Sequence, residues 1–387
     1  MSRLEDSWKE VRDILVFGWG NVGKKCIDKL MMDFNVVQII DNEEEKQGEY
    51  KGITIAGLDS TLEIVKQYKV IVMTNGKVYS QIREELQDIG LQEYRDFCSI
   101  ELFISEWYWK YRTQNCILEI HTAVTMRCTL KCKNCNMFVP YYKEQIDYTF
   151  EEIRQDYDLL FQFVDYVFCI ELLGGEPLLN RDLKRIILYL SEKYGNRIGT
   201  IGIVTNGSIV PDDELAAALS NDKVIIYISD YRDAVSYGDR FKEVVNVCKG
   251  KRLKFEIRQA ILWKDFGIPC RQGEYRSESV REHMLTCAPM FHGLNDKKYY
   301  FCHVAWSAEK AGFYRLKESD FIDLGRLDAG CDTDKRRLAA HSMGENIGQG
   351  HVSLCRICGG CGRDNPIEVH AGEQCMRGSN GRVCIFT

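Results

Sequence analysis

The chain has 387 residues, 45% of them hydrophobic, which is enough to bury a sizeable core in two or three domains. Its formal charge of −6 is spread without long runs of one sign, which argues against a nucleic-acid partner. No apolar stretch approaches the roughly 20 residues that span a bilayer, and the start MSRLEDSWKE lacks the layout of a signal peptide. We therefore expect a cytoplasmic protein with no membrane or nucleic-acid partner.

The first hundred residues alternate between apolar runs and helical stretches, which is the pattern of βα units. Apolar runs at 14–17, 36–40 and 70–73 predict three buried strands with helices between them. Strands connected through helices pair in parallel, so we expect an α/β domain over residues 1–100.

A glycine-rich turn follows the first of these strands. Gly18, Gly20 and Gly23 form a G-x-G-x-x-G turn before a helix, where the helix N-terminus favours a phosphate or nucleotide, and Asp41 lies where a ribose partner is expected. Residues 12–98, with IDNEEEKQGEYKGITIAG after the second strand, resemble the small Rossmann-like domain that precedes some bacterial sugar acyltransferases. The resemblance implies a nucleotide-sugar pocket, and a purely structural turn is the alternative.

An aromatic stretch leads into a second α/β region. Trp107, Trp109 and Tyr111 predict a linker helix over 101–116 that packs the two domains together. A partial barrel is expected over 117–265 and a cysteine-rich extension over 266–387. The apolar runs that predict the strands of this barrel are 117–124, 168–173, 199–204, 224–229 and 253–259. Chemistry in such a barrel lies at the C-terminal ends of its strands.

Seventeen cysteines are far more than an ordinary cytosolic protein carries, and in a reducing compartment they favour metal binding or catalysis over disulfides. Cys128, Cys132 and Cys135 follow the first barrel strand in a C-x3-C-x2-C loop. Three thiolate ligands on a four-iron cluster leave one iron open for a substrate or cofactor. A structural zinc loop is the alternative.

With this loop after its first strand, the region resembles the radical SAM superfamily, whose fold is a partial (β/α)6 barrel. A second match, the family's GGEP motif, follows the second barrel strand. Two further matches are Thr205-Asn206-Gly207 at the end of the third strand and Ser229-Asp230 at the end of the fourth. The residues that the resemblance assigns to cofactor binding are Gly174, Gly175, Glu176, Pro177, Asn206 and Ser229. A turn-only role is the alternative for the third and fourth strand ends. One departure is Lys133, at a position that is usually aromatic or apolar and touches adenine.

The resemblance implies a 4Fe-4S cluster at the three cysteines that reductively cleaves S-adenosylmethionine. The resulting 5′-deoxyadenosyl radical takes a hydrogen atom from a substrate, in a barrel that excludes solvent. A reducing partner such as flavodoxin or ferredoxin is expected to supply the electron.

A second set of cysteines lies downstream and resembles the SPASM or twitch extension of radical SAM enzymes, with two cysteines at a hairpin and a late C-x2-C pair. We expect Cys287, Cys302, Cys355 and Cys358 to hold a second 4Fe-4S cluster, with Cys361 as a substitute. A zinc site is the alternative. The cysteines left unassigned are Cys270, Cys331, Cys375 and Cys384.

Two other side chains near the barrel are of interest. His121 lies inside a strand, which favours a packed, hydrogen-bonded histidine over a metal ligand. Arg258 ends the fifth strand, where it is a candidate to face the cofactor carboxylate or the substrate.

The main functional hypothesis is hydrogen abstraction from a small polar substrate, a sugar or nucleotide-sugar, leading to epimerisation, dehydration or oxidation. One alternative is a SPASM-type peptide maturase, although the βα pattern at the N-terminus differs from a leader-peptide-binding domain. Another alternative is a non-catalytic iron-sulfur or zinc protein that senses redox state or scaffolds partners. The GGEP segment argues against that alternative, because a scaffold needs no clamp for an amino group.

Overall fold

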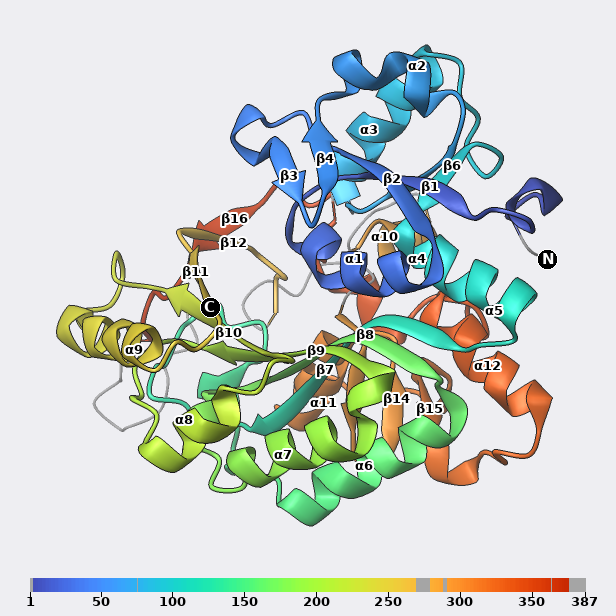
Figure 1. Cartoon of the computed structure of the whole chain (residues 1–387). Coiled ribbons are helices and arrows are strands. Elements are labelled where there is room, and N and C mark those ends of the chain that lie inside the picture. Colours follow the sequence, from blue (N-terminus) through green and yellow to red (C-terminus); the bar gives the residue numbers. More distant parts are fainter. Residues whose placement is uncertain (1–2, 75, 269–278, 288–290, 363, 376–387) are drawn as a thin grey trace. The chain divides into compact units, whose positions relative to one another are not determined.

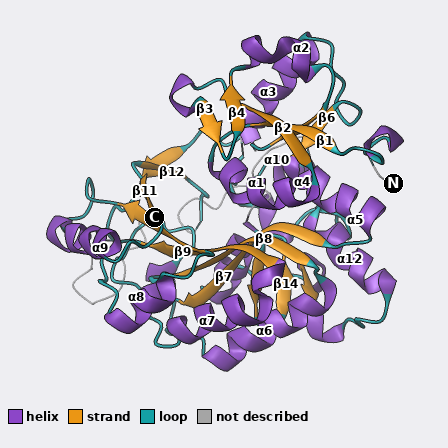
Figure 2. Cartoon of the chain, in the orientation of Figure 1, coloured by secondary structure: helices purple, strands orange, loops and turns teal. Residues whose placement is uncertain are grey.

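The computed structural model divides the chain into two compact units, 1–118 with 164–168 and 119–163 with 169–387. Figure 1 shows their elements and Figure 2 their helices and strands. The structure describes residues 3–74, 76–268, 279–287, 291–362 and 364–375. Cys270 and Cys384 lie outside the described residues.

The first unit is built on a six-stranded sheet in the order β3-β4-β2-β1-β5-β6. All its neighbouring strands pair in parallel except β3, which is antiparallel to β4. The strands are β1 (Asp13–Phe17), β2 (Asn35–Ile40), β3 (Gly48–Tyr50), β4 (Ile53–Ala56), β5 (Lys69–Val72) and β6 (Phe97–Ser99). The three strands expected from apolar runs are confirmed as β1, β2 and β5. Four of the five residues of β1 are buried, as expected for a central parallel strand.

Helices of the first unit are α1 (Asn21–Asp33), α2 (Leu62–Val65), α3 (Gly76–Asp88), α4 (Ile100–Leu102) and α5 (Tyr108–Arg112), with a π-helical turn over Phe103–Trp107. The aromatic stretch predicted as a linker forms these last turns. Its Trp107 ring lies 4.7 Å from the Phe34 ring and 5.3 Å from the Phe103 ring, and Trp107 is buried. The rings therefore form part of the core of the first unit.

The glycine turn of the first unit is fastened to the end of β2. Asp41 is 6% exposed. Its Oδ2 accepts a hydrogen bond from Trp19 N at 2.7 Å, and its Oδ1 accepts one from Glu43 N at 2.9 Å. Both carboxylate oxygens thus bind backbone of this unit, and the role of Asp41 toward a ribose stays a prediction.

The second unit contains an eight-stranded sheet in the order β11-β10-β9-β8-β7-β13-β14-β15. The five strands expected between residues 117 and 259 are confirmed as β7 to β11, in consecutive order. Their bounds are β7 (Cys116–Thr125), β8 (Tyr166–Gly174), β9 (Ile198–Thr205), β10 (Val224–Asp230) and β11 (Phe255–Gln259). This is the α/β partial barrel predicted from the sequence.

Helices between these strands are α6 (Phe150–Phe163), α7 (Leu183–Tyr194), α8 (Asp213–Leu219) and α9 (Gly238–Gly250). In Figure 1, α6, α7 and α8 lie on one side of the sheet. Strands β9, β10 and β11 pair in parallel, and residues that follow β7, β8 and β9 contact one another, so the loops after these strands can share one site.

The cysteine-rich region extends the sheet on its other side. It contains α10 (Val280–Thr286), β13 (Gly293–Asn295), β14 (Lys298–Tyr300), α11 (His303–Lys310), β15 (Phe321–Asp323) and α12 (Asp332–Ser342). The hairpin expected between Cys287 and Cys302 is confirmed, because β13 and β14 pair in antiparallel fashion. A separate ribbon pairs β12 (Leu262–Lys264) with β16 (Glu368–His370).

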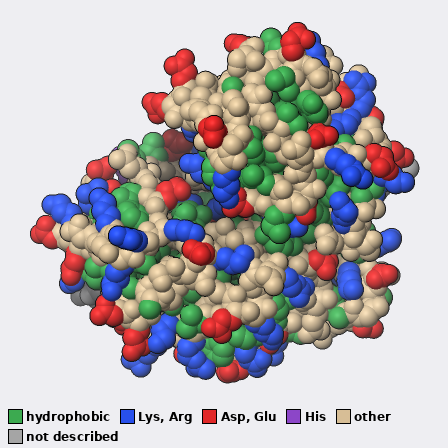
Figure 3. Space-filling model, in the orientation of Figure 1, with side chains coloured by type: hydrophobic (Ala, Val, Ile, Leu, Met, Phe, Trp, Pro, Cys, Tyr) green, Lys and Arg blue, Asp and Glu red, His purple; other side chains and the backbone are tan. Residues whose placement is uncertain are grey.

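On the face drawn in Figure 3, acidic and basic side chains are interspersed. Among the helices of the described residues, none combines the length and the apolar character needed to cross a membrane.

The glycine turn makes a testable prediction about stability. A Cβ added at Gly23 would lie 2.3 Å from Gly18 O, whereas one at Gly20 meets nothing within 4 Å. We expect Gly23→Ala to lower the free energy of unfolding by about 2–3 kcal/mol, because the backbone at Gly18 would have to move away from the added methyl group. Gly20→Ala should lower it by less than about 1 kcal/mol. Urea unfolding of both variants checks this. Equal effects would contradict the assigned close approach.

Candidate functional site

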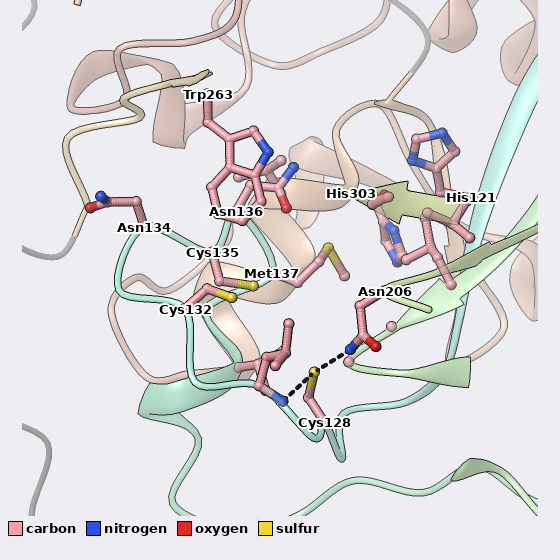
Figure 4. Close-up of a pocket in the computed structure, with 18 of the residues that line it drawn as sticks. His121, Cys128, Cys132, Asn134, Cys135, Asn136, Met137, Asn206, Trp263 and His303 are labelled. Carbon is pink, nitrogen blue, oxygen red and sulfur yellow. Dashed lines mark hydrogen bonds between the residues drawn. The ribbon is translucent and has the colours of Figure 1, made fainter. Parts of the chain in front are cut away.

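The three predicted cluster cysteines lie in the loop that follows β7. The loop is folded by Cys135 N, which donates to Cys132 O at 3.2 Å, and by Phe138 N, which donates to Cys135 O at 2.9 Å. Two sulfurs receive hydrogen bonds. Cys128 Sγ accepts from Leu130 N at 3.4 Å and from Asn206 Nδ2 at 3.5 Å, as Figure 4 shows. Cys132 Sγ accepts a hydrogen bond from Gln374 Nε2 at 3.4 Å.

Burial governs the protonation of these thiols. It raises the pKa of Cys128 to about 11 and that of Cys132 to about 12, and it also raises the pKa of Cys135. A thiolate is the form that binds a metal, so a bound cation must supply the stabilisation that the buried site otherwise lacks. The N–H donors already aimed at the sulfurs suit thiolate ligands.

The glycines after β8 allow this strand end to touch the cysteine loop. A Cβ at Gly174, where φ is +148°, would lie 1.9 Å from Thr125 O, and one at Gly175 would lie 2.1 Å from Arg127 O. Gly175 N donates to Thr125 O at 2.8 Å. Glycine is therefore required here by packing against the loop backbone.

Glu176 joins the ends of β8 and β9. It is fully buried, and its carboxylate accepts hydrogen bonds from Thr205 Oγ1 at 2.8 Å, Asn206 N at 2.8 Å and Leu178 N at 3.2 Å. Burial raises the pKa of Glu176 to about 7. Neither Glu176 nor Pro177 lines the cavity next to the cysteines, whereas Gly174 and Gly175 do. The cofactor role of Glu176 and Pro177 stays a prediction.

A cavity of about 410 Å³ opens beside the cysteine loop. All three loop cysteines line it, together with Asn206 and Ser229 from the ends of β9 and β10. Figure 4 shows the cysteines and Asn206 around this space. The structure thus brings together, from four consecutive strand ends, the residues predicted for the first cluster and for S-adenosylmethionine, except Glu176 and Pro177.

The other part of the cavity wall is polar and carries His121 and Glu171. His121 Nε2 lies 2.9 Å from Glu119 Oε1 and 3.5 Å from Glu171 Oε2. His121 is therefore hydrogen-bonded, as predicted, but it also faces the cavity, which the strand pattern did not indicate. Ligand-type atoms of all three residues lie within 4.8 Å of one another.

His303 lines the same cavity. Asn295 exchanges two hydrogen bonds with the backbone of Ala123, and these bonds fix its Oδ1 as an acceptor. His303 Nε2, 3.0 Å from that oxygen, must therefore carry the proton. Burial lowers the pKa of His303, so the ring is neutral. Its Nδ1 is then a buried lone pair without a partner among the described residues.

Other cavity residues were missed from the sequence. Trp263 on β12 and Tyr231 after β10 supply aromatic walls. Glu171 could have been found as a lone carboxylate in the apolar run FCIELL. No local sequence pattern distinguishes Trp263 and Tyr231 from other aromatic residues. Arg258 does not line the cavity. Its guanidinium lies 3.6 Å from the centre of the Tyr227 ring and pairs with Glu256, and a role for Arg258 toward cofactor or substrate stays a prediction.

The downstream cysteines gather around a second, smaller cavity of about 20 Å³. The four favoured as ligands, Cys287, Cys302, Cys355 and Cys358, all line it. Cys361 does not line it but lines the larger cavity, and its Sγ lies 3.2 Å from Cys287 Sγ.

The direction of the pKa shift differs among the four favoured thiols. The hydrogen bond from Cys361 lowers the pKa of Cys287 to about 7, whereas burial raises the pKa of Cys302 to about 12. Burial also raises the pKa values of Cys355 and Cys358. Such a set of converging sulfurs can hold either a cubane cluster or a zinc ion.

The fold and these geometries place three converging cysteine thiols at the strand ends of an α/β partial barrel. A model of the radical SAM superfamily matches residues 122–255. Residues 122–255 therefore match a radical SAM domain, and the activity of the whole chain remains a proposal. Members of this superfamily use a 4Fe-4S cluster and S-adenosylmethionine. A second family model, described as C2185-like, N-terminal, matches residues 10–97.

No curated protein matches the chain. Solved structures with low similarity include anSMEcpe with bound AdoMet and Cp18Cys peptide (18% identity, 38% of this chain and 44% of that chain, TM-score 0.31). Another is Streptococcus suis SuiB bound to S-adenosylmethionine (16%, 48% and 39%, TM-score 0.30). A third is BtrN in complex with AdoMet and 2-DOIA (16%, 62% and 92%, TM-score 0.38). The match thus spans less than half of anSMEcpe.

The position of Glu176 predicts a structural effect of its removal. Glu176→Ala leaves the buried Thr205 and Asn206 donors unpaired, so we expect the free energy of unfolding to fall by about 2–4 kcal/mol. Glu256→Ala, which removes a partly exposed carboxylate, should cost about 1 kcal/mol or less. Chemical unfolding of both variants measures this. A Glu176→Ala protein that is fully stable but no longer binds S-adenosylmethionine would show instead that Glu176 acts on the cofactor.

Proposed function

We propose that the protein is a radical SAM enzyme in which Cys128, Cys132 and Cys135 hold the 4Fe-4S cluster and the adjoining cavity binds S-adenosylmethionine and a small polar substrate. When bound, the cluster and S-adenosylmethionine supply a 5′-deoxyadenosyl radical that takes a hydrogen atom from the substrate. The observation that carries the proposal is the convergence of the three cysteines, Asn206 and Ser229 on one cavity.

The residues of the loop suit this cofactor. The sulfurs of Cys128 and Cys132 accept N–H hydrogen bonds, which stabilise thiolate ligands. Gly174 and Gly175 hold the end of β8 against the loop, and Asn206 reaches Cys128 from the end of β9. The aromatic rings of Tyr231 and Trp263 close the wall and help to exclude water from a reactive radical.

The substrate we propose is a sugar or nucleotide-sugar. The carboxylate of Glu171 and the imidazole of His121 offer hydrogen-bond acceptors, which match the hydroxyl or amino groups of a sugar. A cavity of about 410 Å³ suits small ligands. The glycine turn at Gly18, Gly20 and Gly23 supports nucleotide binding by the first unit. Epimerisation, dehydration and oxidation all begin with the same abstraction.

We also propose a second 4Fe-4S cluster held by Cys287, Cys302, Cys355 and Cys358. Its support is that these four side chains line one small cavity, although they come from the residue after α10, the end of the hairpin and a late C-x2-C pair. Cys361, next to Cys287, lines the larger cavity and is the candidate substitute ligand.

Iron counting and S-adenosylmethionine cleavage test both cluster sites. Anaerobically reconstituted protein should hold about eight irons and, once reduced with dithionite, release 5′-deoxyadenosine. Cys128→Ala should lower the count to about four and abolish release. Cys355→Ala with Cys358→Ala should also lower the count to about four, but release should continue. Cys331→Ala, at the start of α12, is the control and should change neither value. Zinc in place of iron, with no release, would refute the proposal.

A panel of nucleotide-sugars tests the substrate class. A substrate should raise the release of 5′-deoxyadenosine in the parent enzyme and appear as a product of changed mass. His121→Gln and Glu171→Gln should reduce product formation at least about tenfold, the loss of roughly 1.4 kcal/mol of binding or transition-state stabilisation, while leaving substrate-free release in place. His351→Gln, outside the cavity, is the matched control. Inertness toward the whole panel, with conversion of a peptide instead, would overturn the sugar assignment.

A further inference from the structure

A short stretch near the end of the described chain runs from the cavity wall to the cysteine loop. It begins as β16, which pairs with β12, the strand that carries the cavity residue Trp263. The contact continues past the ribbon, because Ala371 N donates to Ile261 O at 3.0 Å. The stretch is thereby fixed to the barrel before it reaches the loop.

Residues 371–375, which we name the C-terminal clamp, then pair with the cysteine loop. Lys133 N donates to Glu373 O at 2.7 Å, and Cys375 N donates to Lys131 O at 2.7 Å. Residues on either side of Cys132 are thus held by backbone hydrogen bonds from a segment about 240 residues away. The side chain of Lys133 also contacts this segment, because its Nζ lies 3.5 Å from Glu373 Oε1. Lys133 does not line the cavity.

Gln374 lies at the centre of the clamp, in an antiparallel bridge with Cys132. Its Oε1 accepts from Lys131 N at 2.7 Å, and its Nε2 donates to Gly372 O at 2.6 Å. Because one partner can only donate and the other can only accept, the orientation of the amide is fixed. Nε2 is therefore the atom that faces Cys132 Sγ, at 3.4 Å.

We propose that Gln374 is a positioning residue that tunes the reduction of the cluster through the Cys132 sulfur. A cluster that takes an electron puts more negative charge on its thiolate ligands, so an N–H donor stabilises the reduced form more than the oxidised form. Gln374 therefore makes the one-electron reduction that precedes S-adenosylmethionine cleavage easier. This inference rests on the proposed function, because it requires the cluster at Cys128, Cys132 and Cys135.

The test is an EPR-monitored redox titration of the reconstituted full-length enzyme, reading the signal that changes when S-adenosylmethionine is added. Gln374→Leu removes the donor and should disfavour reduction about tenfold, a potential about 59 mV lower for a one-electron couple. Gln374→Glu keeps the acceptor for Lys131 N but replaces the donor with a negative charge, so its potential should fall further. Gln162→Leu and Gln162→Glu, the same changes on α6, should leave the potential at the parent value.

Amide hydrogen exchange of the resting holoenzyme separates tuning from a merely structural role. Gln374→Leu should speed exchange at Lys131 N, whereas Gln374→Glu should leave that exchange near the parent rate while still lowering the potential. If the loop is disturbed in Gln374→Leu, the Gln374→Glu variant alone decides the question. Equal potentials in the parent and both Gln374 variants would overturn the inference and leave the proposed function intact. A parent enzyme with no cluster that responds to S-adenosylmethionine would overturn both.

Discussion

The close approach of the β8 end to the cysteine loop is the constraint on which the site depends. The backbone at Gly174 and Gly175 lies so near the carbonyl oxygens of Thr125 and Arg127 that no side chain fits between them. This contact places the loop over the barrel edge, where the end of β9 delivers Asn206 to the sulfur of Cys128. Glu176, one residue later, ties β8 to β9 from inside the fold. The same tetrapeptide thus brings three strand ends together.

The electrostatics of the cavity follow from this arrangement. Its polar wall consists mainly of thiols, amides and two imidazoles, and among its described lining residues Glu171 is the only carboxylate and Lys264 the only lysine or arginine. Lys264 is already paired with Glu368. A cavity of this kind suits cationic and hydrogen-donating ligands, and S-adenosylmethionine carries both an ammonium and a sulfonium charge. This lining is compatible with the proposed binding of S-adenosylmethionine.

Much of the barrel could be predicted because its strands are continuous apolar runs and its cysteine loop is local in sequence. The C-x3-C-x2-C spacing and the GGEP segment predict the radical SAM match over residues 122–255. The polar wall was harder to predict. His121 and Glu171 lie on neighbouring strands, and their approach depends on register, which periodicity does not determine.

The contribution of Gln374 could not be predicted from local pattern at all. It is a single polar residue in an irregular segment, and it meets Cys132 only because the β12–β16 ribbon carries the chain back to the loop. Glu176 shows the opposite difficulty. Its motif predicts contact with the cofactor, whereas its burial and its three hydrogen bonds give it a place between strand ends.

Mössbauer spectroscopy of protein reconstituted with ⁵⁷Fe resolves an iron that lacks a protein ligand. With two clusters bound, adding S-adenosylmethionine should change the signal of about one iron in eight, and this change should be absent from the Cys128→Ala protein. A spectrum in which no iron responds to S-adenosylmethionine would contradict the assignment of an open, three-cysteine cluster to this loop.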